Sequence, residues 1–463
     1  MSSRSGGLLE LVARGKKDIF FTSNPTVRYI HSVYTRSSPF VKEIHVSKPR
    51  NIPEWGKYVD FDIEHRGDLM KHVYIRLELP TWLPASARQA NRTGIVTDPS
   101  GVTFGYTNNV GFQILEKIQL FQDQVLLYET YGEYLDWRVR QSYPLAKTYI
   151  LADEIGARDE SPLSIGRSAT PSMLRIPIPI PGSHTPSDPG FPMVALHNQR
   201  FRIRVHLRPL REIVVASDGR IHPQPWGGTP LRIQSTKQGP VDSSQTTLPL
   251  TSMKSIGVSL ETTQVYVTPD VQLMLRSQTL RIPYVSIQFQ QYTIEDNQMT
   301  AAALSSSPFS YSMPIDCIGS VERLLLGFRS EAANLAGQRT ILTAVPASLR
   351  LNIANTDRVK VWNPAVFREV AGYWKHTRIA LNASNTDVPE EVYTITFGGM
   401  DQNMPLGTFN FTRASQPNLF LILHSLPYDP RTIQRTMFGL LYAESWNVFE
   451  IRQGRGKMMF DDT

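Results

Sequence analysis

The stretch that decides the fold runs from Lys57 to Leu79 and reads KYVDFDIEHRGDLMKHVYIRLEL. In its two ends, KYVDFDIE and HVYIRLEL, apolar residues occupy every second position and mostly polar residues lie between them. Strict alternation predicts β-strands with one buried and one solvated face, because successive side chains of a strand point to opposite sides. Such half-buried strands are typical of antiparallel sheets.

The same period of two recurs along the chain. It appears in RFRIRVHLR (200–208), VSIQF (285–289) and SLRLNI (348–353). Helical signals are few and short. One is GGLLELVARG near the start, and the other is TPDVQLMLRSQ, where Pro269 and Asp270 suit a first helical turn. The chain is therefore expected to be all-β, with a few short helices.

Three long turn-rich segments separate the expected strands: Pro80–Asn109, Ser161–Gly190 and Ala216–Ser252. Loops of this length in compact domains are usually functional or interaction surfaces. The two halves of the chain repeat one plan of alternating strands, long loops and a late strand-rich block. The helix expected at Pro269–Ser277 lies between them, so two β-sandwiches in tandem are predicted.

Composition limits the function. The 463 residues include 33 prolines, which favour loops between short strands over long helices. The net charge of +7 permits an anionic partner without requiring one. Cys317 is the only cysteine, which excludes an intramolecular disulfide and a multi-cysteine zinc site. A reducing compartment such as the cytosol is the simplest interpretation.

No catalytic motif is recognisable in the sequence. The ten histidines are scattered, and neither HExxH nor GxSxG occurs. The segment RQGRGKMM has Met458 where a phosphate-binding loop needs Ser or Thr. Cys317 is interpreted as a small buried apolar residue. We therefore expect no enzyme, no cofactor and no metal site.

Two further motifs have simple structural explanations. The integrin tripeptide RGD occurs at residues 66–68, but it lies between two strands, where Gly and Asp are ordinary turn residues. The basic face of Arg202, Arg204 and Arg208 could contact phosphates. A solvent or interface face paired with acids is favoured, because no aromatic platform is interleaved with these arginines.

The opening GLLELVARGKKDIFFTSNPTVRYIHSVYTRSSPF, Gly7–Phe40, resembles the N-terminal signature of the double-jelly-roll major capsid proteins of nucleocytoplasmic large DNA viruses. That signature joins Gly-Leu-x-x-Leu-Val-Ala-x-Gly to an Asp followed by apolar residues, then Thr-x-Asn-Pro, Tyr-x-Arg and a Phe. The matching residues are Gly7, Leu8, Leu11, Val12, Ala13, Gly15, Asp18, Thr22, Asn24, Pro25, Tyr34, Arg36 and Phe40.

The likeness continues through both halves. HRGDLMKHVYIRLELP resembles the family's Arg-x-Gly-Asp-Leu strand pair, and VYVTPDVQLMLRSQ resembles the last strand of the first jelly roll with its connecting helix. PLGTFNFTRA is similar to Pro-x-Gly-x-x-Asn-Phe-Ser-Arg, with Thr412 in place of Ser. WNVFEIRQGRGKMMF is similar to the terminal strand and its glycine tail. The likeness ends in the loops, above all Ala216–Ser252.

The resemblance implies a double jelly roll, that is, two tandem eight-stranded jelly rolls with long loops. The expected parts are an N-terminal arm (1–25), a first jelly roll (26–268) and a second jelly roll (269–463). The second jelly roll is expected to begin with a connecting helix and to end with a basic tail. The resemblance also implies a homotrimer that forms a pseudo-hexagonal capsomer. Neighbouring capsomers would tile an icosahedral shell over an internal membrane.

The same resemblance implies a location and contact residues. The expected location is the capsid shell of the virion, after assembly in the host cytoplasm, with minor capsid proteins as partners and no direct contact with the genome. Inner-face contacts are expected from the arm and the tail: Leu8, Leu11, Val12, Arg14, Lys16 and Lys17, and Arg452, Arg455 and Lys457. Asn91 and Asn382 are candidate glycosylation sites.

Three alternatives stay open. A minor capsid paralogue would share the fold and differ in copy number. A carbohydrate-binding double β-sandwich is a second alternative, since jelly rolls also occur in lectins, and Trp226 in HPQPW is its only candidate contact. An enzyme on a jelly-roll scaffold, such as a cupin, would need a compact set of histidines and carboxylates.

Overall fold

The computed structural model describes most of the chain between residues 38 and 460, in the following ranges: 38–80, 94–97, 102–142, 151–158, 165, 168, 173–183, 190–196, 199–218, 232–235, 256–295, 309–331, 346–354, 356–362, 392–397, 407–423 and 436–460. The chain divides into two compact units, Met1–Phe40 and Val41–Thr463. Apart from the first residue of β1, every element below belongs to the second unit.

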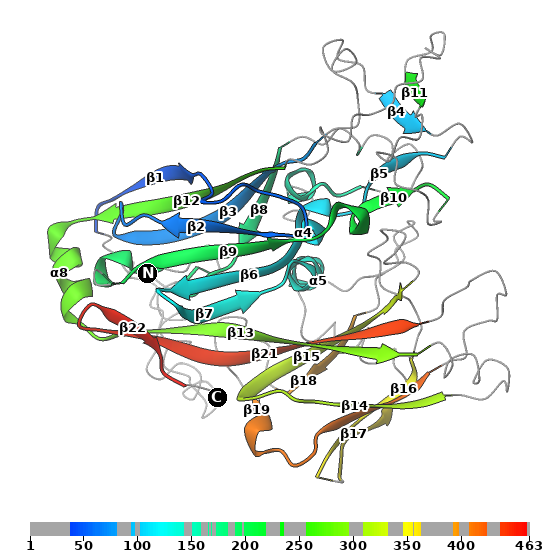
Figure 1. Ribbon diagram of the computed structural model, residues 1–463. Helices are drawn as coiled ribbons and strands as arrows, with labels where there is room; N and C mark the ends of the chain where they lie inside the picture. The colour runs from blue at the N-terminus through cyan, green and yellow to red at the C-terminus, as the bar shows by residue number, and fades with distance from the viewer. Residues whose placement is uncertain are drawn as a thin grey trace, which may run out of the picture. The chain divides into compact units, whose positions relative to one another are not determined.

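Two four-stranded antiparallel sheets make up the first half of this unit (Figure 1). One has the order β1–β12–β3–β8 and the other β2–β9–β6–β7. Their inward side chains, such as Ile75 and Ile203, form one buried core between the sheets. The strands are β1 (Phe40–Ser47), β2 (Tyr58–Ile63), β3 (Leu69–Glu78), β6 (Leu115–Gln122), β7 (Val125–Thr130), β8 (Leu174–Ile178), β9 (Phe201–Leu207) and β12 (Gly257–Val267).

The second half repeats this construction. Its sheets have the orders β13–β21–β15–β18 and β14–β20–β16–β17, and a second buried core lies between them. The strands β19 (Phe409–Asn410) and β22 (Arg455–Met458) extend the first of these sheets by pairing with β15 and β21. The other strands are β13 (Leu280–Ile294), β14 (Phe309–Pro314), β15 (Ser320–Ser330), β16 (Pro346–Ile353), β17 (Thr356–Trp362), β18 (Tyr393–Thr396), β20 (Asn418–Leu423) and β21 (Met437–Arg452).

The two halves have the same strand order. If the eight sandwich strands of each half are numbered along the chain, one sheet reads first, eighth, third, sixth and the other reads second, seventh, fourth, fifth. This arrangement of two packed four-stranded sheets is a jelly roll. The prediction of an all-β chain with two tandem eight-stranded jelly rolls is therefore confirmed. The boundary at residues 268 and 269 stays a prediction, although no described strand pairs across it.

Helices are short and lie between strands. The helix expected from TPDVQLMLRSQ forms over the predicted residues, as α8 (Pro269–Ser277), and joins β12 to β13. Sequence reasoning missed α4 (Val110–Ile114) and α5 (Gly132–Ser142). The described residues also include helical residues 151–155 and three turns of 3-10 helix: η1 (Met193–Ala195), η2 (Leu210–Glu212) and η5 (Phe411–Arg413). Within the described residues, no helix is long and apolar enough to cross a membrane.

Two predictions about connections need correction. β2 and β3 do not form a strand pair, because they belong to opposite sheets and the turn at 64–68 carries the chain between them. None of the three segments predicted to be turn-rich is only a loop, because Ser161–Gly190 contains the sandwich strand β8 and both Pro80–Asn109 and Ala216–Ser252 contain short strands. Their short strands β4 (Gly94–Thr97) and β5 (Phe104–Tyr106) pair with β11 (Arg232–Ser235) and β10 (Val214–Ala216), at the end of the sheets opposite α8 (Figure 1).

Candidate functional site

The main contact between the two jelly rolls is an aromatic cluster on the outer face of sheet β13–β21–β15–β18. Tyr442 of β21 lies at its centre, with ring centroids 5.1 Å from Trp137, 5.8 Å from Tyr134 and 4.8 Å from Phe289. Tyr134 and Trp137 come from α5 of the first jelly roll, whereas Phe289 lies on β13. Packed rings of this kind contribute large buried areas, so this contact holds the two jelly rolls together.

The helix α5 lies close to its neighbours because it begins with a glycine. A Cβ atom at Gly132 would lie 2.1 Å from the Phe112 carbonyl oxygen and 2.2 Å from that of Leu115. Any other residue would push the start of α5 away from α4 and β6. The position therefore requires glycine, and α5 presents Tyr134 and Trp137 to the second jelly roll as a result.

A buried charge network lies beside this cluster. The Arg323 side chain on β15 donates to the Glu444 carboxylate on β21, and the Tyr134 hydroxyl donates to the same carboxylate at 2.6 Å. Burial alone would raise the pKa of Glu444, but the charges of Arg323 and Arg138 and these hydrogen bonds outweigh it and lower the pKa below its ordinary value. Burial and the Glu444 charge raise the pKa of Tyr134 well above 10, so its hydroxyl stays a donor.

A second charge cluster lies beside the same contact. Glu133 of α5 pairs with Arg329 of β15, and both side chains are 3% exposed. Arg208 lies 3.9 Å from both Glu133 and Glu212. These groups line a cavity of about 530 Å³ between the jelly rolls, whose other charged residues include Glu116 and Lys117. Acidic and basic side chains are balanced there, which argues against a site for a strongly charged ligand.

Neither cluster has the side chains of a metal site. Among the described residues, no three His, Cys, Asp or Glu side chains are placed to hold a metal ion. Cys317 is buried, and burial followed by the charge of Asp316 raises the pKa of its thiol to about 12. A protonated buried thiol is a poor nucleophile. These properties match the interpretation of Cys317 as a small core residue.

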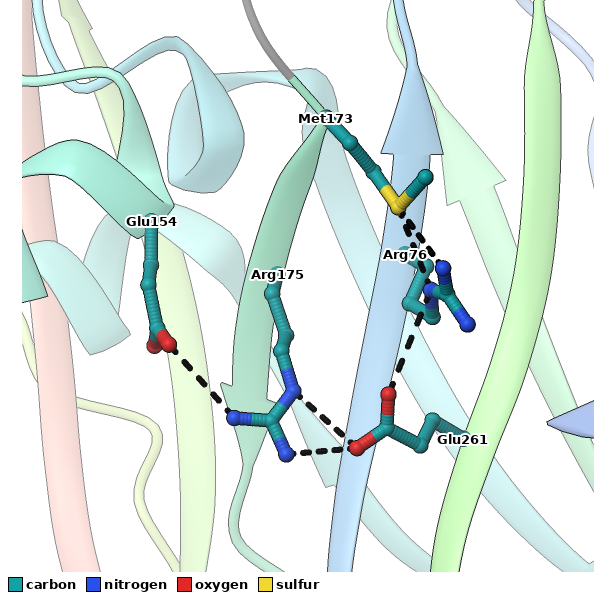
Figure 2. Close-up of polar contacts among 5 residues, drawn as sticks. All are labelled: Arg76, Glu154, Met173, Arg175 and Glu261. Carbon is teal, nitrogen blue, oxygen red and sulfur yellow. Dashed lines mark hydrogen bonds and ion pairs between the residues drawn. The ribbon is translucent and has the colours of Figure 1, made fainter. Parts of the chain in front are cut away.

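The corresponding sheet of the first jelly roll carries a polar network on its outer face. Figure 2 shows Arg175 of β8 reaching Glu261 of β12 across the intervening strand β3, with Nε and Nη2 at 3.0 and 2.5 Å from Oε1. Its guanidinium lies 3.7 Å from the centre of the Tyr74 ring on β3. Arg76 of β3 approaches the same glutamate at 4.0 Å and contacts the Met173 sulfur.

The predicted basic face is paired with acids. Arg204 donates two hydrogen bonds to Asp60, at 2.8 and 3.0 Å, and Arg202 lies 3.8 Å from the same carboxylate. Contrary to expectation, aromatic rings are interleaved with these arginines, since the Arg204 guanidinium lies 4.2 Å from the Tyr58 ring and 5.4 Å from that of Phe121. The cross-strand neighbours β2 and β6 supply both rings. These aromatic residues were not adjacent in sequence, so the pattern was not visible there.

The predicted basic tail is a β-hairpin. Arg452, Arg455 and Lys457 lie on β21 and β22, and the turn between the strands places Gln453 and Gly454 at φ angles of 53° and 78°. Lys457 approaches Glu450 at 3.8 Å. The hairpin is anchored on the first jelly roll, where the Gly456 amide donates to Gln199 Oε1 at 2.7 Å. The inner-face role of these residues stays a prediction.

Other sequence-predicted residues have structural roles or lie outside the description. Asp68 of the RGD tripeptide is buried and accepts hydrogen bonds from the Val267 amide and the Gln272 side chain, so it fixes the junction of β12 and α8. A buried aspartate is unavailable to an adhesion receptor. Several predicted positions fall outside the described residues: Leu8, Leu11, Val12, Arg14, Lys16, Lys17, Asn91, Trp226 and Asn382.

Sequence reasoning missed the inter-barrel residues. Glu444 lies inside the apolar run FGLLYAESW, and Arg323 lies in VERLLLGF. A charged residue inside a long apolar strand indicates burial on both faces with a charged partner. That signal was present for both strands. The partner Tyr134 had no comparable signal, because α5 was not predicted.

Comparison with known proteins gives two kinds of likeness. No protein-family model matches the chain. The major capsid protein of Pyramimonas orientalis virus is 22% identical over 477 residues, which cover 99% of this chain and all of that protein. Capsid protein 1 of Acanthamoeba polyphaga mimivirus is 30% identical over 132 residues. That match covers 28% of this chain and 21% of the mimivirus protein, and a probable capsid protein of the same virus is matched over 24% of its length.

Solved structures have the same fold at low identity. VP54 of PBCV-1 has a TM-score of 0.68 at 13% identity, with 94% of this chain and all of that one covered. The Faustovirus major capsid protein has a TM-score of 0.61 at 13% identity, with 95% and 94% covered. At such identities the likeness shows the fold alone.

The fold is a double jelly roll, and the chain is similar in sequence to capsid proteins of viruses. The resemblance to the major capsid proteins of nucleocytoplasmic large DNA viruses, predicted from the opening stretch and the later motifs, is confirmed by the sequence relatives from large DNA viruses.

Proposed function

We propose that the chain is the major capsid protein of a large DNA virus and has no enzymatic activity. Three copies would form a pseudo-hexagonal capsomer, and capsomers would tile an icosahedral shell over an internal membrane. The observation that supports this most is the identical strand order of the two jelly rolls, fused through one buried contact. Three such chains present six similar blocks, which is what a six-sided tile requires.

The test is the mass of the purified full-length protein in solution. The expected value is three times the 52.3 kDa of one chain, by light scattering coupled to size-exclusion chromatography. A stable monomer at all concentrations would contradict the proposal. Copy number separates this function from that of a minor capsid paralogue, because the major protein is the dominant band of purified particles.

The inner face is proposed to include the arm and the basic hairpin. Arg452, Arg455 and Lys457 are exposed, and the exposed Met459 and Phe460 follow them. Basic and apolar groups together suit contacts with minor capsid proteins or with anionic lipid. Charge reversal at Lys16 and Lys17 tests the proposed role of the arm. Unchanged assembly and unchanged apposition of shell and membrane would argue against their role.

Virion location, assembly in host cytoplasm and the lack of genome contact belong to the same proposal. The balanced charges of the described clusters support a structural role rather than nucleic-acid binding. A carbohydrate-binding function has less support, since the exposed arginine and tyrosine side chains near Asp60 are already paired with each other. A glycan array with the purified trimer would separate the two.

A further inference from the structure

We propose that the cavity between the two jelly rolls binds a small zwitterion, and that a phosphocholine group fits it best. The ligand would place its quaternary ammonium against aromatic rings that line the cavity and its phosphate on Arg208. This site goes beyond the proposed function. One chain supplies both walls, so the inference does not depend on how copies assemble.

The cavity has the size of a small-molecule site and both apolar and charged walls. Its volume is about 530 Å³, and sites for small ligands typically measure ~300–1,000 Å³. The first jelly roll supplies mainly charged groups, among them Lys117 and Arg208. The second jelly roll supplies apolar side chains of β13 and β21: Phe289, Phe438, Leu440 and Tyr442. Such a mixture suits a ligand with an apolar part and a charged part.

Arg208 is the group that a ligand would complete. Its side chain is 14% exposed and lies 3.9 Å from the carboxylates of both Glu133 and Glu212. These carboxylates offset its charge but lie beyond hydrogen-bond distance, and its buried Nε has no acceptor among the described residues. Buried polar groups normally have hydrogen-bond partners. A phosphate in the cavity would accept the hydrogen bonds, since its oxygens match the planar fork of donors of a guanidinium.

Aromatic rings provide the place for a cation. The rings of Tyr131, Phe289 and Tyr442 form a cluster, with centroids 4.8 to 5.8 Å apart. The Lys117 ammonium already lies 5.7 Å from the centre of the Tyr131 ring, so the chain itself places a cation at this wall. Quaternary ammonium groups bind to aromatic faces. Among the described residues, no side chain pairs with the Glu331 carboxylate of the cavity wall, and this charge would attract the same group.

The balance of charge selects a ligand without net charge. The cavity is lined by as many acidic as basic side chains. A simple anion on Arg208 would lie close to Glu133 and Glu212, and both carboxylates would repel it. An ammonium group on the same molecule offsets this repulsion, because the carboxylates attract it. A zwitterion therefore fits the cavity better than phosphate or a metal cation.

Binding of simple fragments to the purified full-length protein tests the inference. Isothermal titration calorimetry compares phosphocholine with choline and with inorganic phosphate. We expect phosphocholine to bind at least ~10-fold more tightly than either fragment, because only the zwitterion uses both walls. Equal affinity for either fragment would overturn the inference, and so would the absence of phosphocholine binding at ~10 mM.

Arg208→Gln and Arg204→Gln are a matched pair of variants. Arg204 lies four residues earlier, donates to Asp60 and does not line the cavity. We expect Arg208→Gln to raise the dissociation constant of phosphocholine at least ~10-fold and Arg204→Gln to leave it within ~2-fold. An unchanged affinity of Arg208→Gln would overturn the inference.

Phe438→Leu gives an answer even if Arg208→Gln fails to fold. Phe438 is a half-buried residue of the cavity wall, and leucine keeps the wall apolar while removing the aromatic face. We expect this variant to weaken the binding of phosphocholine at least ~3-fold. An unchanged affinity would show that no cation rests on the rings, which overturns the inference.

Vesicles of phosphatidylcholine separate the two sources of the group. Co-sedimentation of the wild type with these vesicles, lost in Arg208→Gln, would assign the site to a lipid headgroup. Binding of free phosphocholine without co-sedimentation would assign it to a soluble compound. Co-sedimentation that is the same in Arg208→Gln, without binding of free phosphocholine, would overturn the inference. None of these measurements reads the mass of the protein in solution, so their failure leaves the proposed trimer untouched.

Discussion

The two sheets that carry corresponding strands differ mainly in what covers them. The outer face of β13–β21–β15–β18 lies under α5 and β7, and its glutamate, Glu444, is fully enclosed with Arg323 and Tyr134. The outer face of β1–β12–β3–β8 holds a similar glutamate, Glu261, among arginines that reach solvent. The same pairing of residue types is therefore enclosed in one place, whereas in the other a buried glutamate is paired with partly exposed arginines.

The difference also explains why the networks are built differently. In the covered sheet Arg323 lies directly opposite Glu444 across the strand pair. In the open sheet Tyr74 lies opposite Glu261, and the arginines reach the carboxylate diagonally. Solvent screens charges that it can reach, so the covered pair depends more strongly on its protein partners than the open network does.

The largest expected effect is at the covered pair. Glu444→Ala should lower the free energy of unfolding by about 3–5 kcal/mol, because it leaves the buried Arg323 charge without its partner. The matched change Glu261→Ala should cost at most about 1 kcal/mol, since its partners are partly solvated. Urea denaturation of both variants at one protein concentration measures the two. Similar losses would show that the two sheets are energetically alike.

Tyr134→Phe is a smaller change at the same place. It removes the hydroxyl that donates to Glu444 from the other jelly roll and keeps the ring contacts with Tyr442. Because the carboxylate loses one of its buried donors, we expect a loss of about 1–3 kcal/mol in the same assay. An unchanged free energy of unfolding would mean that the ring, rather than the hydrogen bond, holds the jelly rolls together.

Acid is expected to destabilise the protein through Glu444 of the covered sheet. The pKa of Glu444 is lowered from its ordinary value of 4.5, as Arg323, Arg138 and the hydrogen bonds outweigh the opposing effect of burial. A carboxyl with a depressed pKa in the folded state stabilises the protein above its unfolded pKa, and that stability is lost as pH falls toward the folded pKa. The melting temperature of the wild type should therefore fall more steeply below about pH 4.5 than that of Glu444→Gln. Parallel curves would contradict this.

The smallest effect is expected at the rim of the open sheet. Met173 is 46% exposed and contacts only the end of Arg76 among the polar contacts in Figure 2. Met173→Ala should change the free energy of unfolding by less than about 0.5 kcal/mol, as is usual for exposed positions. A loss above about 1 kcal/mol would show that this face is better ordered than its exposure indicates.

Whether a strand can be predicted from the sequence also depends on whether its faces are covered or open to solvent. Strands with one solvated face, such as β2, β3 and β9, alternate clearly and were predicted. β15 and the first part of β21 are buried on both faces, so their sequences read as apolar runs without a period. The long-range pairing of β4 with β11 and of β5 with β10 was not predicted, because these short strands lie in segments dominated by turn residues.

The candidate site was less predictable than the fold. The alternating pattern places Arg204 and Asp60 on polar strand faces. It also predicts that the arginines pair with acidic residues, although it does not name Asp60 as the partner. The contact of α5 with β21 joins residues about 310 positions apart, and nothing local to either segment identifies the other. The family resemblance supplied the double jelly roll, but the residues that join its halves required coordinates.

The helix α8 has a consequence for assembly. It is nine residues long and ties the last strand of one jelly roll directly to the first strand of the next. The two different jelly rolls are therefore always synthesised in equal numbers and are covalently joined. In the proposed capsomer the two kinds of jelly roll would therefore alternate around the ring, and their order would need no sorting step.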